Sequence, residues 1–176
     1  MRFEFFFAAP AIVVACAPAF SEDFLTVSQA QTLMFSAAQF TPSDFVLSDD
    51  QITVLMQTVS GRLWRRQIKA WRVSTGGWFF VDQVIGRDDR ITYALGLDKD
   101  GAVKGVEILT CLQKYDGIRR PEWRAQFIGR RFGKLDLLDQ ISTISGSTLS
   151  TTHIAEGVQR MLATYALFLA PKSNAS

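Results

Sequence analysis

Hydroxyl side chains are concentrated in the stretch ISGSTLSTTHIAEGVQRML, residues 144–162. They surround Gly146 and precede a run with helical apolar spacing, and they are Ser145, Ser147, Thr148, Ser150, Thr151 and Thr152. A helix needs one N-cap, which Ser150 or Thr151 is expected to supply, while the other hydroxyls bond to the backbone of the turn. Because the stretch has more hydroxyls than a cap needs, a second interpretation is that one of them takes part in a reaction.

Two chemistries are open to such a hydroxyl. A hydrolase would use Ser145 or Ser147 as nucleophile and His153 as base, but SGSTLS lacks the second glycine of a G-x-S-x-G elbow. A phosphate site has firmer support, because a glycine turn that enters a helix offers free N–H groups and the positive end of the helix dipole. The nucleotide-binding patterns GxxxxGK[ST] and GxGxxG do not occur in the sequence.

The composition argues against several other kinds of site. His153 is the one histidine, and Cys111 is the one cysteine that would remain after removal of an N-terminal leader, so a tetrahedral Cys/His metal site and an internal disulfide are not expected. Cys111 lies in an apolar run and is expected to be a buried structural thiol. The net charge of +2 does not require a nucleic-acid partner. A basic run indicates either a solvated face or an anion-handling rim: Lys114, Arg119, Arg120, Arg124, Arg130, Arg131 and Lys134.

The N-terminal 20 residues are expected to be a signal peptide or a lipoprotein signal. The apolar stretch 5–15 is too short to span a membrane, and Ala17-Pro18-Ala19 fits a cleavage site. The segment VVAC also resembles a lipobox, in which Cys16 would carry the lipid. The alternative is an N-terminal strand or helix of the core. Three further segments are expected: helical residues 21–60, a domain over 61–171, and a frayed tail over 172–176.

Apolar periodicity predicts an α+β fold, with an antiparallel sheet of about four strands, N-terminal helices and a C-terminal helix packed on the sheet. Helices are expected at 28–40 and 48–59, the second with a capping box at Ser48 and Gln51. Strands are expected at 63–73, 78–86, 91–98 and 103–112, with a bulge at Gly105. A short helix is expected within 119–127, with Pro121 at its first position. The last helix, 147–170, has one apolar stripe: Ile154, Val158, Met161, Leu162, Tyr165 and Leu169.

The stretch DQISTISGSTLS, from Asp139 to Ser150, resembles the covalent flavin-attachment motif of the bacterial FMN-binding domain. That motif is an acid, a few residues, S-G-A-T and another hydroxyl, and its threonine corresponds to Thr148. Ser147 replaces the usual alanine. This family includes one subunit of the sodium-translocating NADH:quinone reductase, one subunit of the related ferredoxin:NAD electron-transport complex, and small exported proteins.

Two upstream stretches extend the resemblance to about residues 91–165. ITYALGLDKDGAVKGVEIL (91–109) is similar to the central hairpin of the family, and PEWRAQFIGR (121–130) is similar to its W/F-x-x-Q-F-x-G-K segment. The E-T-P-G-L-G stretch of the large-complex members is missing, and QKYDGIRR stands in its place. This departure favours a small stand-alone member and leaves the contacts of the isoalloxazine ring open.

The resemblance implies FMN held covalently on Thr148. A separate flavin transferase would move FMN from FAD to the Thr148 hydroxyl, forming a phosphoester and releasing AMP, and Asp139 would belong to the sequence that the transferase recognises. Ser145, Gly146 and Ser147 would shape the turn, and the helix from Ser150 would present N–H groups to the phosphate. Tyr115 and Trp123 are candidates to stack on the flavin or to pack in the core, and Arg119, Arg120 and Arg124 to neutralise phosphate or meet an acidic partner. Trp64, Trp71 and Trp78 are expected in the sheet core.

The function that follows is an exported electron-transfer flavoprotein, a redox carrier more than a self-sufficient enzyme. Its electron donor and acceptor would be membrane-bound or periplasmic, and the protein would be periplasmic or attached to the outside of the inner membrane. Two alternatives stay open. One is a binding module of the same fold that holds flavin non-covalently or holds none, and the other is a small flavin-dependent periplasmic reductase.

Overall fold

The computed structural model describes residues 22–63, 65–86, 90–111, 116–133 and 137–171. Several residues considered above lie outside these ranges: the leader with Cys16, Trp64, Lys114, Tyr115, Lys134 and the tail 172–176. No helix in the described ranges is long and apolar enough to cross a membrane.

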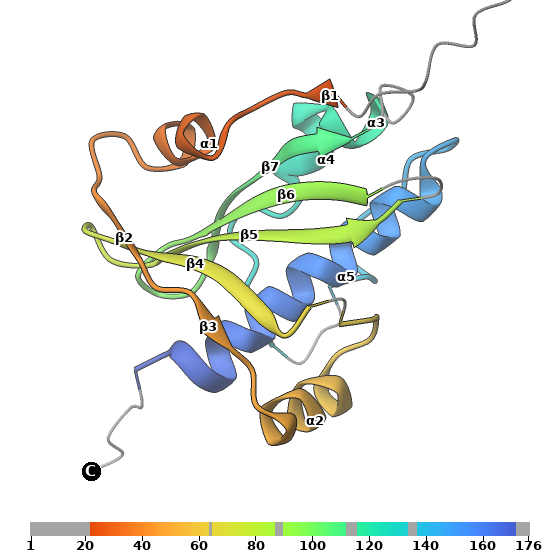
Figure 1. Ribbon diagram of the computed structural model, residues 1–176. Helices are drawn as coiled ribbons and strands as arrows, with labels where there is room; N and C mark the ends of the chain where they lie inside the picture. Colours follow the sequence, from red (N-terminus) through yellow and green to blue (C-terminus); the bar gives the residue numbers. More distant parts are fainter. Residues whose placement is uncertain (1–21, 64, 87–89, 112–115, 134–136, 172–176) are drawn as a thin grey trace, which may run out of the picture.

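Four antiparallel strands form the centre of the sheet, as the alternation of apolar residues predicts (Figure 1). They are β4 (Gln67–Val73), β5 (Trp78–Ile85), β6 (Arg90–Leu97) and β7 (Val103–Cys111). Three short strands extend this meander: β1 (Glu22–Asp23) pairs with β7, and β2 (Phe40–Pro42) and β3 (Phe45–Val46) both pair with β4. The path through the sheet is therefore β1-β7-β6-β5-β4-β2. The predicted α+β class is confirmed.

The turn between β6 and β7 is fixed by its own side chains. Asp98 Oδ1 accepts hydrogen bonds from the N–H groups of Asp100 and Ala102, both at 2.9 Å. Gly101 has φ +76°, and a Cβ there would lie 2.3 Å from the ring of Tyr165, so a side chain is excluded on both counts. Beyond the turn, Gly96 faces Gly105 but Leu97 faces Val103. The predicted bulge is therefore present, with Lys104 as the extra residue beside Gly105.

Two capped helices precede the meander. In α2 (Asp49–Thr58), Ser48 and Gln51 form the predicted capping box, and Thr26 and Gln29 form another in α1 (Val27–Met34). The prediction of one helix over 28–40 is wrong after Met34. Ala37 has φ +59°, and Phe40 begins β2 and packs edge-to-face on Phe35 and Phe79. Pairing with the sheet thus ends the helical conformation.

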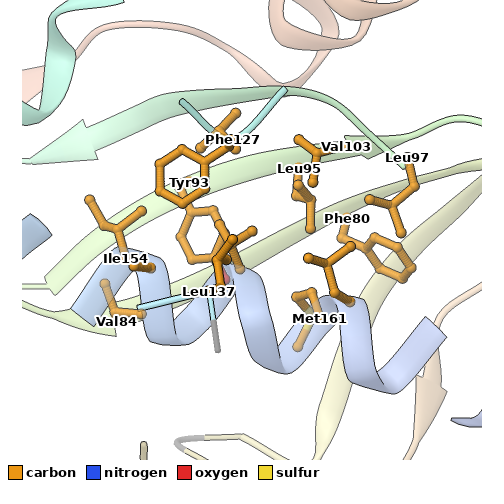
Figure 2. Close-up of a cluster of buried hydrophobic side chains, with 14 of the residues drawn as sticks. Phe80, Val84, Tyr93, Leu95, Leu97, Val103, Phe127, Leu137, Ile154 and Met161 are labelled. Atoms are coloured by element: carbon orange, nitrogen blue, oxygen red, sulfur yellow. The ribbon is translucent and has the colours of Figure 1, made fainter. Parts of the chain in front are cut away.

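The C-terminal helix α5 (Thr148–Thr164) crosses one face of the sheet and continues as a short π-helix, η2 (Tyr165–Leu169) (Figure 1). Figure 2 shows Ile154 and Met161 of α5 directed at Phe80, Val84 and Tyr93 of the strands. The predicted stripe is confirmed, because its first five members are at most 8% exposed and Leu169 packs at the edge of the same core. Cys111 and Trp78 are buried as expected, and Trp71 is partly buried against Phe79.

On the other face of the sheet, α1 covers a smaller core. Its buried members are Ala30, Met34, Phe35, Val73, Phe79, Ala94 and Leu109. Beyond α1 this face is hollowed by a trough of about 580 Å³, whose floor includes Lys69, Val81 and Thr92. The helix α5 therefore packs on the more completely buried face.

The segment between β7 and the hydroxyl cluster contains two short helices, α3 (Asp116–Arg119) and α4 (Pro121–Ala125). Pro121 occupies the first turn of α4, as predicted. The helix begins at this proline and not earlier, because Arg120 is extended with ψ 124°. A residue before proline is disfavoured in the helical region, so the chain breaks there and restarts.

Candidate functional site

A tight turn directly precedes α5. The N–H of Ser147 donates to the carbonyl of Ile144 at 2.9 Å, and Gly146 within the turn has φ +82°. A Cβ built at Gly146 would meet no atom within 4 Å. Glycine is therefore required there for its backbone conformation and not for lack of space.

The hydroxyls of the cluster take different positions. Ser147 is the N-cap residue of α5, so the prediction of Ser150 or Thr151 as the cap is wrong. Both of those residues are 1% exposed inside the helix, and the Thr151 hydroxyl donates to the carbonyls of Thr148 and Ser147 at 2.8 and 3.1 Å. Side chains in this first part of the helix are thus divided between the core and solvent.

Thr148 is the first residue of α5 and is exposed, as are Ser145 and Gly146. Its Oγ1 lies 3.4 Å from the carbonyl oxygen of Ile144, a long hydrogen bond that leaves the hydroxyl accessible. The first N–H groups of a helix have no partner within the helix, and its dipole is positive at that end. An exposed hydroxyl in this place is suited to carry a phosphate group.

The residues that lead to the turn are hydrogen-bonded to side chains of α4 and of the segment that follows it. Trp123 Nε1 donates to the carbonyl of Ser142 at 2.8 Å, and the N–H of Ser142 donates to Gln126 Oε1 at 2.9 Å. Gln140 Oε1 accepts from Arg130 at 2.5 Å. Asp139, the acid of the motif, is exposed beside this attachment. The loop is therefore held by specific bonds although it has no regular secondary structure.

Of the two aromatic residues considered as candidates to stack on the flavin, the structure describes Trp123 but not Tyr115. Trp123 is 3% exposed and packs edge-to-face on Phe127, with ring centroids 5.2 Å apart. It is a core residue whose accessible part lines a groove of about 340 Å³. That groove also contains Arg120, Glu122, Gln126, Ser142, Thr143 and Ile144. Tyr115 lies outside the described residues.

The three arginines considered as candidates to neutralise phosphate make different contacts. Arg124 is ion-paired with Glu107 and donates to the carbonyl of Val106 at 3.0 Å. The guanidinium of Arg119 lies 3.7 Å from the ring centroid of Phe24. Arg120 is exposed and lines the groove beside Ile144. Of these three, Arg120 is the one whose position next to the turn suits an anionic group.

A second groove, of about 450 Å³, lies beside the first turns of α5, and Leu149, His153 and Arg160 help to line it. His153 Nδ1 lies 2.5 Å from the carbonyl oxygen of Ile85. This contact joins the helix to the end of β5. Two residues near Thr148 line these grooves: Leu149, which follows it, lines one, and Ile144, whose carbonyl the Thr148 hydroxyl contacts, lines the other.

A buried polar cluster anchors the middle of α5, and sequence reasoning missed it. Arg160 donates to Asp82 Oδ2 at 2.5 Å and to the carbonyl of Arg62 at 2.8 Å. The Tyr93 hydroxyl donates to the same Asp82 oxygen at 3.0 Å. The available signal was an acid inside the apolar strand WFFVDQVI and an arginine on a helix face that is otherwise apolar.

The charges in this cluster stabilise one another. Burial raises the pKa of Tyr93 well above its ordinary value, and the negative charge of Asp82 raises it further. Burial acts to lower the pKa of Arg160, but Tyr93 and Asp82 outweigh it and the pKa is raised. The arginine is therefore charged and the tyrosine neutral at physiological pH.

No group of three or more metal-type ligands occurs among the residues that the structure describes.

The fold and the site define a small α+β domain that presents an exposed hydroxyl at the start of its C-terminal helix. Residues 86–163 match the sequence model of the FMN-binding domain, which identifies this part of the chain as an FMN-binding domain. The resemblance stated from the motifs is thereby confirmed, and the ligand that the family assigns to this domain is FMN. No curated protein matches the sequence.

Proposed function

We propose that this protein is an exported electron carrier whose FMN is attached through its phosphate to Thr148. The observation that carries the proposal is the exposed Thr148 hydroxyl at the first residue of a 17-residue helix, inside the matched range 86–163. The residues fit FMN in two ways. The helix start suits the phosphate, and the grooves lined by the nearby residues Leu149 and Ile144 offer space for the rest of the molecule.

The roles of this chain's residues follow from their positions. Gly146 and Ser147 set the direction in which the helix starts, and the N–H groups of its first turn face the phosphate position. Arg120 lines the groove on the Ile144 side, where a cation balances phosphate charge. When bound, FMN supplies one- and two-electron redox chemistry, and the protein holds it in place and sets its surroundings.

The proposal also includes partners and location. A flavin transferase that uses FAD attaches the cofactor, and the bond formed between Thr148 Oγ and phosphorus replaces the bond to AMP, which leaves as the hydroxyl proton is lost. A membrane-bound or periplasmic donor and acceptor exchange electrons with the carrier. A covalent bond keeps the flavin from being lost outside the cytoplasm, which supports a periplasmic location or, through Cys16, attachment to the outside of the inner membrane.

Intact-mass spectrometry tests the attachment. The full chain is purified after co-expression with a flavin transferase, and we expect the mass of one FMN minus one water. Thr148→Ala abolishes this adduct, whereas Ser147→Ala, which matches the alanine usual at this position in the family's motif, retains it. An adduct on the Thr148→Ala protein, or bound flavin that denaturation releases entirely from the wild type, contradicts the proposal.

A further inference from the structure

The loop before α5 is fixed in space by side chains that are distant in sequence. Both backbone groups of Ser142 are engaged, the carbonyl by Trp123 Nε1 at 2.8 Å and the N–H by Gln126 Oε1 at 2.9 Å. Trp123 lies in α4 and Gln126 is its C-cap residue, and residues three apart along a helical turn lie on the same side, so one side of this segment supplies both contacts. Gln126 also donates from Nε2 to the carbonyl of Trp123 at 3.3 Å, which orients its amide.

The far end of the loop is fixed as well. A Cβ at Gly117, in α3, would lie 3.1 Å from both Ile144 Cγ2 and Ser147 Oγ, so the helix and the turn are in close contact. Ile144 is partly buried and packs against the main core. The loop is thus held at Ser142 and again at Ser147, and Thr148 follows directly.

This arrangement makes the Thr148 hydroxyl a preformed acceptor. An unstructured segment would have to be ordered by the enzyme that modifies it, at a cost in conformational entropy. Here the folded domain has already ordered the segment, and the hydroxyl is exposed in that state. A transferase therefore needs no local unfolding to reach Thr148.

We propose that the transferase recognises this folded acceptor and not the motif as a linear sequence, and that Gln126 is a positioning residue for flavin attachment. The inference rests on the proposed function, because it concerns the reaction that would load Thr148. It also gives a physical link between two stretches that resemble the family's motifs. Trp123 and Gln126, the W and Q of the W-x-x-Q pattern, form hydrogen bonds with Ser142 in the loop that carries the flavin-attachment motif.

The test measures the rate at which purified full-length protein gains FMN, by intact mass, when incubated with FAD and a purified flavin transferase. Gln126→Leu keeps the size of the side chain but removes the acceptor for the Ser142 N–H, and Gln126→Glu keeps an acceptor oxygen. The matched control is Gln57→Leu, at an exposed glutamine of α2 far from the loop in sequence. Circular dichroism establishes that each variant is folded before its rate is measured.

Attachment to Gln126→Leu is expected to slow by about tenfold or more, because small displacements of a reacting group have effects of this size. Gln126→Glu and Gln57→Leu should stay within about twofold of the wild type on the same scale. Hydrogen exchange provides a readout that needs no flavin: the Ser142 amide should lose protection in Gln126→Leu and regain it in Gln126→Glu.

The two proposals fail in distinguishable ways. If wild-type protein gains no FMN at Thr148, the proposed function fails and this inference with it. If the wild type is modified and a folded Gln126→Leu variant is modified equally fast, the inference alone is overturned. It is also overturned, again alone, if Gln126→Glu is as slow as Gln126→Leu although its Ser142 amide is protected.

Discussion

The two ends of α5 differ in what surrounds them. At its start, Thr148 is exposed and Leu149 is 46% exposed, whereas Met161, Ala163 and Thr164 near its end are completely buried. The buried part anchors the helix on the sheet, and the exposed part is then free to present a side chain. The contrast indicates that different turns of one helix stabilise the fold and present the candidate attachment residue. Substitutions at the buried end should therefore lower stability, whereas substitutions at the exposed end should change it little.

The largest effect is expected from the ion pair that anchors the middle of the helix. Asp82→Asn removes the charge that faces Arg160, whose side chain is 3% exposed. An arginine left buried without its partner should lower the free energy of unfolding by about 3–5 kcal/mol. Urea denaturation measures this loss.

The control for this prediction is Asp100→Asn, which removes an exposed partner of Lys99. It should change stability by about 0.5 kcal/mol or less, because exposed ion pairs contribute little. Equal losses in the two variants would show that the buried pair does not anchor α5.

A pair of truncations compares the two ends of α5 directly. Met161→Ala creates a cavity at a completely buried position and should lower stability by about 2–5 kcal/mol. Leu149→Ala shortens a half-exposed side chain and should change it by about 0.5 kcal/mol or less. Thermal or urea unfolding compares them, and similar losses would remove the distinction between the ends.

Apart from the near-neutral variants Asp100→Asn and Leu149→Ala, the smallest loss of stability is expected at the turn. Gly146→Ala places a Cβ at φ +82°, which should lower stability by about 1–2 kcal/mol. Gly146→Asn should lose less, because asparagine tolerates this conformation better and the space around the position is open. A larger loss for Asn than for Ala would indicate that space and not backbone conformation limits this position.

Features with a local cause were predictable from the sequence. The meander follows from alternating apolar residues, the cap of α2 from Ser48 and Gln51, and the packing of α5 from its apolar stripe. Each depends on residues close together in the chain. Thr148 was singled out by resemblance to a motif, since the spacing of hydroxyls alone favoured a cap among Ser150 and Thr151.

Features with a distant cause were not predictable. The helix expected over 28–40 ends early because Phe40 pairs with a strand 33 residues away, at Val73. Arg160 and Asp82 meet across 78 residues of sequence. The two-residue strands β1 and β3 are too short to show a pattern. Likewise, nothing near Ser142 indicates that α4 holds it, because that contact depends on how the chain folds back.

The order of the strands limits how far this chain can be shortened. The family match begins at residue 86, but β5 ends at Ile85 and pairs with β6 along its whole length, from Trp78 with Leu97 to Ile85 with Arg90. A fragment cut at the boundary of the match would leave β6 with an open edge and expose the core face around Tyr93. The smallest fragment expected to fold therefore includes β5, and the region of sequence similarity is narrower than the folding unit.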